Sequence, residues 1–282
     1  LKVDDFYTSV NEGKWTLDKM KEIGTNAYAD LDGDSTVSTG DRYGVVVNDY
    51  NHMAGFMASL ETVFTKIGDD GRQHISGDSE HTIDTMQKIV KVFNNNDGIF
   101  YMNKSDAVPS VVAENHDVYR SMFKDDRLLI ITSEFNQISS VFRDMKSDYG
   151  IIPYPKYDEA QENYYTTIWK SFQAVCVPST CSHPDEVGFI LEALAAGSDK
   201  LNDAYYNICL ESKYTRDPES FEMIGLARQN VLYDIGFIYD WGKLYSSMNA
   251  AAAANDGTMA SLIGSLSDTA KAAAENFIKE LR

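Results

Sequence analysis

The spacing of apolar residues along the chain predicts short helices and short buried strands. Thr16 has the hydroxyl that an N-cap requires, so a helix is expected to begin there and to run over residues 17–23. Residues 43–47 form a short run of mostly β-branched side chains, which is typical of a buried strand. Residues 79–94 place apolar side chains at helical spacing. One face of that helix should therefore pack against another element.

The later part of the chain alternates strands with helices and then becomes mostly helical. Strands are expected at 128–132, 150–152 and 172–177. Helices are expected at 184–196, 217–231, 250–254 and 268–282. Pro184 suits the first turn of the first of these helices. Alternating strands and helices with a helix-rich C-terminal third predict the α/β fold class.

Composition and charge exclude several classes of protein. With 282 residues, of which 43% are hydrophobic, the chain is long enough to bury a core. The 25 Lys and Arg against 43 Asp and Glu give a formal net charge of −18, which repels phosphate backbones. No nucleic-acid partner is therefore expected. No apolar run approaches the roughly 20 residues that a membrane-spanning helix needs.

The common catalytic motifs are absent from the sequence. There is no GxGxxG, Walker loop, GxSxG or HExxH segment, and the five histidines are isolated in polar surroundings. A carbohydrate-active hydrolase that uses a carboxylate pair stays open, because 43 acidic residues offer many pairs. Cys176, Cys181 and Cys209 lack CxxC spacing and are interpreted as ordinary buried thiols, with a bridge between the first two left open.

One acidic segment has the spacing of a calcium-binding loop. Positions 1, 3, 5, 9 and 12 of a twelve-residue loop are filled by Asp30, Asp32, Asp34, Ser38 and Asp41, and Thr36 at position 7 would offer its carbonyl. This is the pattern by which an EF-hand-like loop binds Ca²⁺. Position 6 is Ser35 where glycine is usual, and position 12 is Asp rather than Glu. The alternative is a solvated loop with Asx-turns.

Aromatic and polar side chains at loops and strand ends are the candidates for ligand binding. The chain has 17 Tyr, 13 Phe and 3 Trp. Trp169 and Trp241 lie in loop-like contexts, where an indole ring can stack on a sugar or lie against a peptide. Tyr50 follows the strand at 45–47, and Glu134 and Asn136 follow the strand at 128–132. Ligands bind at strand ends in open α/β sheets, so these three residues are also expected in the site.

The order of several segments resembles the family 1 extracellular solute-binding proteins of ABC importers. The segments are Gly13-Lys-Trp-Thr-Leu-Asp-Lys-Met20, Asp30-Leu-Asp-Gly-Asp34 running into Asp41-Arg-Tyr-Gly44, Phe123-Lys-Asp-Asp-Arg-Leu-Leu-Ile-Ile131, and Asp148-Tyr-Gly-Ile-Ile-Pro-Tyr-Pro-Lys-Tyr157. The resemblance extends from about Gly13 to the C-terminus. It rests on the order and the residue pattern of these segments rather than on one diagnostic motif.

The resemblance implies a type II periplasmic-binding-protein-like architecture, in which two α/β lobes close on a ligand that is often an oligosaccharide. It also implies a binding protein that serves an ABC permease outside the cytoplasm or in the periplasm, anchored as a lipoprotein. The absence of catalytic motifs predicts that it is not an enzyme, and a monomer is expected. Because such a protein has most of its first lobe ahead of the Trp15 helix, we expect this chain to be a fragment. Its second lobe would comprise 1–122 and 199–282, and residues 123–198 would form an incomplete first lobe with crossing strands.

Overall fold

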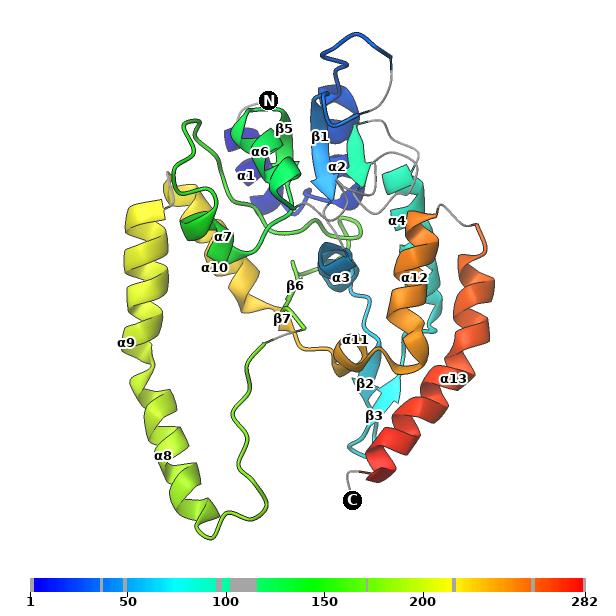
Figure 1. The fold of residues 1–282 in the computed structure, drawn as a ribbon, viewed down its shortest axis with the longest axis vertical. Coiled ribbons are helices and arrows are strands. Elements are labelled where there is room, and N and C mark those ends of the chain that lie inside the picture. Colours follow the sequence, from blue (N-terminus) through cyan, green and yellow to red (C-terminus); the bar gives the residue numbers. More distant parts are fainter. Residues whose placement is uncertain are drawn as a thin grey trace.

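A computed structural model describes residues 3–35, 38–47, 50–94, 98–101, 116–170, 172–214, 217–254 and 257–280. The elements form a body, from which an arm that includes α8 and α9 projects (Figure 1). Mixed helices and strands confirm the predicted α/β class. The two-lobe arrangement stays a prediction.

A three-stranded parallel sheet lies in the body. Its strands are β1 (Tyr43–Val47), β4 (Ile99–Tyr101) and β5 (Leu128–Ile131), in the order β4-β1-β5. Val45 pairs with Ile99 on one side and Ile130 on the other. The strands expected at 43–47 and 128–132 are therefore confirmed, the second to within one residue. Every residue of β1 is buried, which explains why its sequence is a continuous apolar run.

The two faces of the sheet contribute to different clusters of buried side chains. Val45 and Val47 join the large cluster, which includes residues from α2 (Leu17–Ala27) and α4 (Glu80–Asn94). Val46 joins a second cluster with Tyr119 and Met122 of α6 (His116–Lys124). The predicted division after residue 122 falls within α6, two residues before that helix ends, and both α6 and β5 pack with β1. The domain boundaries stay a prediction.

Three glycines allow helix α2 to pack closely against the sheet. Its start is the predicted one, since Thr16 Oγ1 accepts a hydrogen bond of 3.2 Å from Lys19 N. A Cβ atom on Gly44 would lie 2.3 Å from Gly24 Cα, and one on Gly98 would lie 1.9 Å from Gly24 O. Backbone therefore packs directly on backbone here, which no larger side chain would permit.

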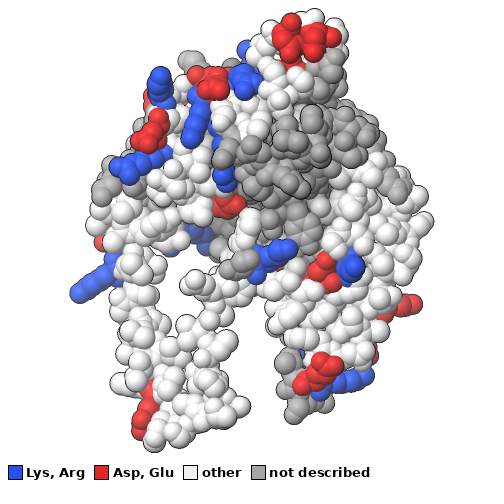
Figure 2. Space-filling model, viewed as in Figure 1, with Lys and Arg blue, Asp and Glu red and all other residues white. Residues whose placement is uncertain are grey.

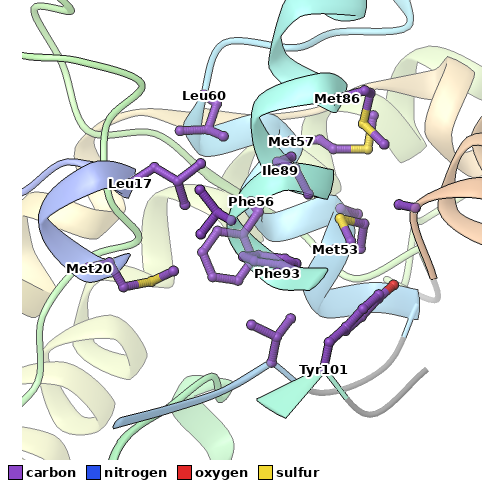
Figure 3. Close-up of a cluster of buried hydrophobic side chains, with 14 of the residues drawn as sticks. Leu17, Met20, Met53, Phe56, Met57, Leu60, Met86, Ile89, Phe93 and Tyr101 are labelled. Atoms are coloured by element: carbon purple, nitrogen blue, oxygen red, sulfur yellow. The ribbon is translucent and has the colours of Figure 1, made fainter. Parts of the chain in front are cut away.

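Helix α3 (Tyr50–Ser59) lies in the middle of the large cluster, and its side chains meet those of α4 (Figure 3). Met53, Phe56 and Met57 are buried. Phe56 contacts Phe93 of α4 edge to face, with ring centroids 5.0 Å apart. Apolar side chains surround α3 on most sides, as expected of a helix inside a core.

The remaining elements of the body are short strands, two further helices and the C-terminal helices. They are α1 (Val3–Asn11), β2 (Thr65–Ile67), β3 (Gln73–Ile75), α7 (Phe135–Ser140), β6 (Thr166–Thr167), α10 (Pro218–Gln229), β7 (Val231–Leu232), α11 (Ile235–Tyr239), η2 (Trp241–Lys243), α12 (Leu244–Ala253) and α13 (Met259–Glu280). β2 and β3 form an antiparallel hairpin, and β6 pairs in parallel with β7. The helix-rich C-terminal third is confirmed.

The arm consists of the extended segment 172–183 with α8 (Pro184–Gly197) and α9 (Asp199–Asn202), and η1 (Asp203–Tyr214) leads back to the body. The helix that begins at Pro184 is confirmed, but none of its residues is buried. The strand expected at 172–177 is wrong: Val175 is 78% exposed and the segment pairs with no strand of the described chain. The strand expected at 150–152 is also wrong. Both segments are apolar, but neither has a described sheet edge beside it to complete a ladder.

Two further features of the described chain bear on earlier expectations. All three cysteines are free thiols, and Cys176 is exposed rather than buried. Within the described ranges, no helix is both long enough and apolar enough to cross a membrane.

Candidate functional site

A cleft of about 1110 Å³ opens in the body. Part of its lining comes from the start of α3, the turn after β5 and helix α7. The rest includes β6 and the segment after it, the end of α10, and residues 231–237. The described lining residues include His52, Arg120, Ser133, Glu134, Asn136, Gln137, Tyr154, Thr167, Trp169, Tyr206, Arg228, Tyr233 and Phe237.

Five hydrogen-bonding side chains form a polar cluster in the lining of the cleft. His52 Nδ1 lies 2.8 Å from the Tyr154 hydroxyl, and His52 Nε2 lies 3.7 Å from Glu134 Oε1. Gln137 Nε2 donates to Glu134 Oε2, and Ser133 Oγ donates to Gln137 Oε1 over 2.9 Å. The side chains of this cluster are therefore held in fixed positions before any ligand arrives.

Local structure explains how these side chains meet. Glu134 is the N-cap residue of α7, directly beyond the carboxyl end of β5, and α3 begins just beyond the carboxyl end of β1. These ends lie at one edge of a parallel sheet, where ligands of such sheets bind. Tyr154 reaches the same place because Gly55 lets its ring lie close: a Cβ atom there would be 2.8 Å from Tyr154 Cζ.

Another part of the lining is aromatic and partly open to solvent. Trp169 is 43% exposed and Tyr233 is 68% exposed, so ring surface is available to a ligand. Phe172 contacts Tyr233 edge to face, with ring centroids 6.4 Å apart. The guanidinium of Arg228 lies over the ring of Tyr206, with Cζ 3.3 Å from the centroid. Flat apolar faces with polar edges are the chemistry that stacks on sugar rings.

A smaller cavity of about 380 Å³ adjoins the cleft. It shares several lining residues with the cleft, Glu134 and Tyr154 among them. Its other walls are mostly apolar, with Phe123, Phe142 and Ile151 among the side chains that form them. The cleft therefore borders an apolar chamber next to the polar cluster.

The structure brings three of the five predicted ligand-binding residues together: Trp169, Glu134 and Asn136 all line the cleft. Trp241 differs from the prediction, since it is 8% exposed and packs instead between neighbouring rings. Its indole is stacked on Tyr239, 5.4 Å between centroids, and touches Phe277 of α13 at 5.6 Å. The left-handed backbone of residues 240, 242 and 243 folds this turn back onto α13. The side chain of Tyr50 lies outside the described residues.

Sequence reasoning missed His52, Tyr154, Tyr206 and Arg228. His52 lies two residues from Tyr50 at the same strand end, so the strand-end argument could have found it. The other three come from segments far away in the sequence, and no local pattern marks them.

The acidic loop brings part of the predicted calcium site together. Ligand oxygens of Asp30, Asp32 and Asp41 all lie within 4.8 Å of one another. Asp34 is not in this group, and Thr36 lies outside the described residues. Ser35, at the sixth position, has a left-handed φ of 60°, the conformation that glycine usually supplies there.

Backbone hydrogen bonds hold the carboxylates of this loop. Asp30 accepts from Gly33 N at 2.6 Å and Ser35 N at 3.0 Å, and these bonds lower its pKa. The bond from Asp34 N lowers the pKa of Asp32, but desolvation and the nearby carboxylates outweigh it, so the pKa is raised. Asp41 is buried and accepts from Ser38 N at 2.9 Å. These contacts fit an anionic loop that a cation would stabilise, and calcium binding stays a prediction.

Comparisons with known proteins find one distant likeness. No protein-family model and no curated protein matches the chain. Among solved structures, it is similar to an ABC transporter solute-binding protein from Thermotoga lettingae TMO bound with alpha-D-tagatose, at 14% identity and a TM-score of 0.46. The similarity covers 95% of this chain, which spans 64% of the length of that one. A likeness at this level does not establish function, which has to be argued from the site.

Proposed function

We propose that the protein binds a sugar or short oligosaccharide in the cleft and does no chemistry on it. The observation behind this proposal is that the exposed rings of Trp169 and Tyr233 line the same cleft as the polar cluster. Sugars need both surfaces, because their C–H faces stack on aromatic rings while their hydroxyls exchange hydrogen bonds with amides, carboxylates and imidazoles. A volume of about 1110 Å³ leaves room for more than one sugar ring.

The set of carboxylates also favours binding over hydrolysis. A glycosidase needs two carboxyl groups that flank the scissile bond. Among the described lining residues of the cleft, Glu134 is the only Asp or Glu, and it is engaged with Gln137. We therefore place the carboxylate-pair hydrolase second.

The biological context of the proposal comes from the resemblance of the sequence to family 1 solute-binding proteins. In that context the protein acts as a monomer outside the cytoplasm or in the periplasm, is tethered as a lipoprotein, and passes its ligand to an ABC permease. The acidic loop would hold one structural Ca²⁺ at a distance from the ligand.

Intrinsic fluorescence tests the binding proposal, because the three tryptophans differ in exposure. Trp15 is 1% exposed and Trp241 is 8% exposed, so Trp169 is the indole that a ligand in the cleft can reach. Titration with a panel of mono- and oligosaccharides should change the emission of the wild-type protein and leave that of Trp169→Phe unchanged. Chromogenic glycosides should show no turnover. Absence of any saccharide response by calorimetry, or turnover at enzyme-like rates, would contradict the proposal.

A further inference from the structure

The charges that line the cleft differ in sign from the charge of the chain. Acidic residues outnumber basic ones by 43 to 25 overall. Among the described residues of the cleft, however, the charged or titratable groups other than tyrosines are His52, Arg120, Glu134 and Arg228. The described lining thus includes two arginines and one carboxylate. A protein with this net charge repels anions over most of its surface, so an arginine at the cleft with no described carboxylate within ion-pair distance, as Arg228 is, calls for a ligand-based explanation.

The carboxylate of the cleft is engaged by its neighbours. Glu134 accepts a hydrogen bond from Gln137 and faces the imidazole of His52 at 3.7 Å. Glu134 is therefore held by its contacts within the polar cluster.

Arg228 is placed for recognition of an anion. It lies in the last turn of α10, and its guanidinium is stacked over the ring of Tyr206, which comes from η1. Stacking uses the face of the guanidinium and leaves the in-plane N–H donors for other acceptors. No described carboxylate lies within ion-pair distance of Arg228. The fork of donors is thus held in one plane at the cleft wall, which is the arrangement that binds a carboxylate with two parallel hydrogen bonds.

We propose that the ligand of this cleft is an acidic saccharide, whose uronic-acid carboxylate pairs with Arg228 while its sugar rings stack on Trp169 and Tyr233. The proposal rests on the proposed function and narrows it to a substrate class. A carboxylate fits better than a phosphate ester, because its single charge is repelled less by a chain of net charge −18.

Matched ligands test the acidic group separately from the sugar. The probes are trisaccharides of galacturonic, mannuronic and guluronic acid, the methyl ester of each, and neutral trisaccharides, measured by calorimetry at low and high salt. We expect one acid to bind about tenfold more tightly than its own methyl ester, with a preference that falls as salt is added. The ester keeps every ring and hydroxyl, so the ratio reports the charge alone.

Matched variants assign the effect to Arg228. Arg228→Gln should bring the acid and its ester to similar affinity, and Arg228→Lys should retain only part of the preference because it lacks the fork. Arg72→Gln removes the same charge from the exposed β2–β3 turn and should keep the wild-type ratio. Equal or tighter binding of neutral sugars or esters would overturn the acidic assignment and leave saccharide binding intact. Tighter binding of sugar phosphates than of uronates would overturn the proposal that the recognised group is a carboxylate. Absence of binding to every saccharide would contradict the proposed function itself.

Discussion

Trp169 and Trp241 have similar sequence contexts, yet their contacts assign them different roles. Trp169→Ala should lower affinity for a bound saccharide about three- to tenfold, because one stacking surface of about 0.5–1.5 kcal/mol is lost. Its effect on stability should be small, since the side chain is 43% exposed. Trp241→Ala should instead lower the free energy of unfolding by about 3–5 kcal/mol through the cavity it leaves beside Tyr239 and Phe277.

Calorimetric titration and urea unfolding of both variants separate these outcomes. Trp241→Phe serves as the control that keeps an aromatic ring at the packed position. A large loss of affinity in Trp241→Phe without a loss of stability would contradict the assignment of that residue to packing.

The acidic loop makes a prediction that does not depend on the cleft. Adding calcium to chelator-treated protein should raise the melting temperature, because an ion that binds only the folded loop stabilises it by mass action. At tenfold excess over a dissociation constant on the order of 10⁻³ M, the stabilisation is about 1.4 kcal/mol. The response should weaken in acid, because protons compete with calcium for Asp32. The hydrogen bond from Asp34 N lowers the pKa of Asp32, but desolvation and the neighbouring carboxylates outweigh it and raise the pKa.

Two aspartates provide the matched comparison for calcium. Asp32→Asn should abolish the rise in melting temperature, whereas Asp70→Asn in the β2–β3 turn should keep it. A wild-type melting temperature that does not respond to millimolar calcium would favour the solvated loop.

At the scale of elements, the sequence predicted the helices and strands that a local residue pattern marks. Thr16 is the N-cap of α2, as its hydroxyl predicted, and the β-branched run at 43–47 is a fully buried strand. The run at 172–177 is also mostly apolar but is exposed, because a strand needs a partner edge and composition does not say whether one is present. The same limit applies to the site. Strand-end residues such as Glu134 could be predicted, but Arg228 and Tyr206 meet only through the tertiary arrangement of α10 and η1.

An ion pair joins the turn before α4 to α13 and makes stability depend on pH. Asp78 accepts hydrogen bonds of 2.5 Å from both Ser267 Oγ and Lys271 Nζ. Partial burial raises the pKa of Asp78, but these two bonds outweigh it, and the pKa lies below its ordinary value of 3.8. A lowered folded-state pKa means that the contribution is present above the ordinary value and is lost as pH falls through the lowered one.

Asp78→Asn should therefore lower the free energy of unfolding by about 1 kcal/mol at pH 7. The difference from wild type should shrink as the pH is lowered through the folded-state pKa of Asp78. Urea unfolding across this range measures it, with exposed Asp84→Asn on α4 as the control. A difference that stays constant with pH would show that the charge of Asp78 does not act in this way.

On the scale of the whole molecule, stability is concentrated in the body. The large cluster joins α1, α2, the sheet, α3, α4 and the C-terminal helices, whereas no residue of α8 is buried. The arm presents a mostly uncharged surface with acidic residues at its tip (Figure 2). Its apolar side chains include Phe189, 77% exposed, and Leu194, 65% exposed.

Substitutions on the arm and in the body should consequently differ in their effect on unfolding. The double change Phe189→Ala with Leu194→Ala should leave the free energy of unfolding within about 0.5 kcal/mol of wild type, since neither side chain has packing to lose and alanine favours helix. Leu17→Ala, at a position with no exposure, should cost about 2–5 kcal/mol. Trp15 emission reports unfolding of the body in both variants, and binding of a hydrophobic dye should fall only in the arm variant. If the arm variant were destabilised as strongly as Leu17→Ala, the arm would have to pack against the body in solution. Phe189 and Leu194 would then be buried rather than exposed.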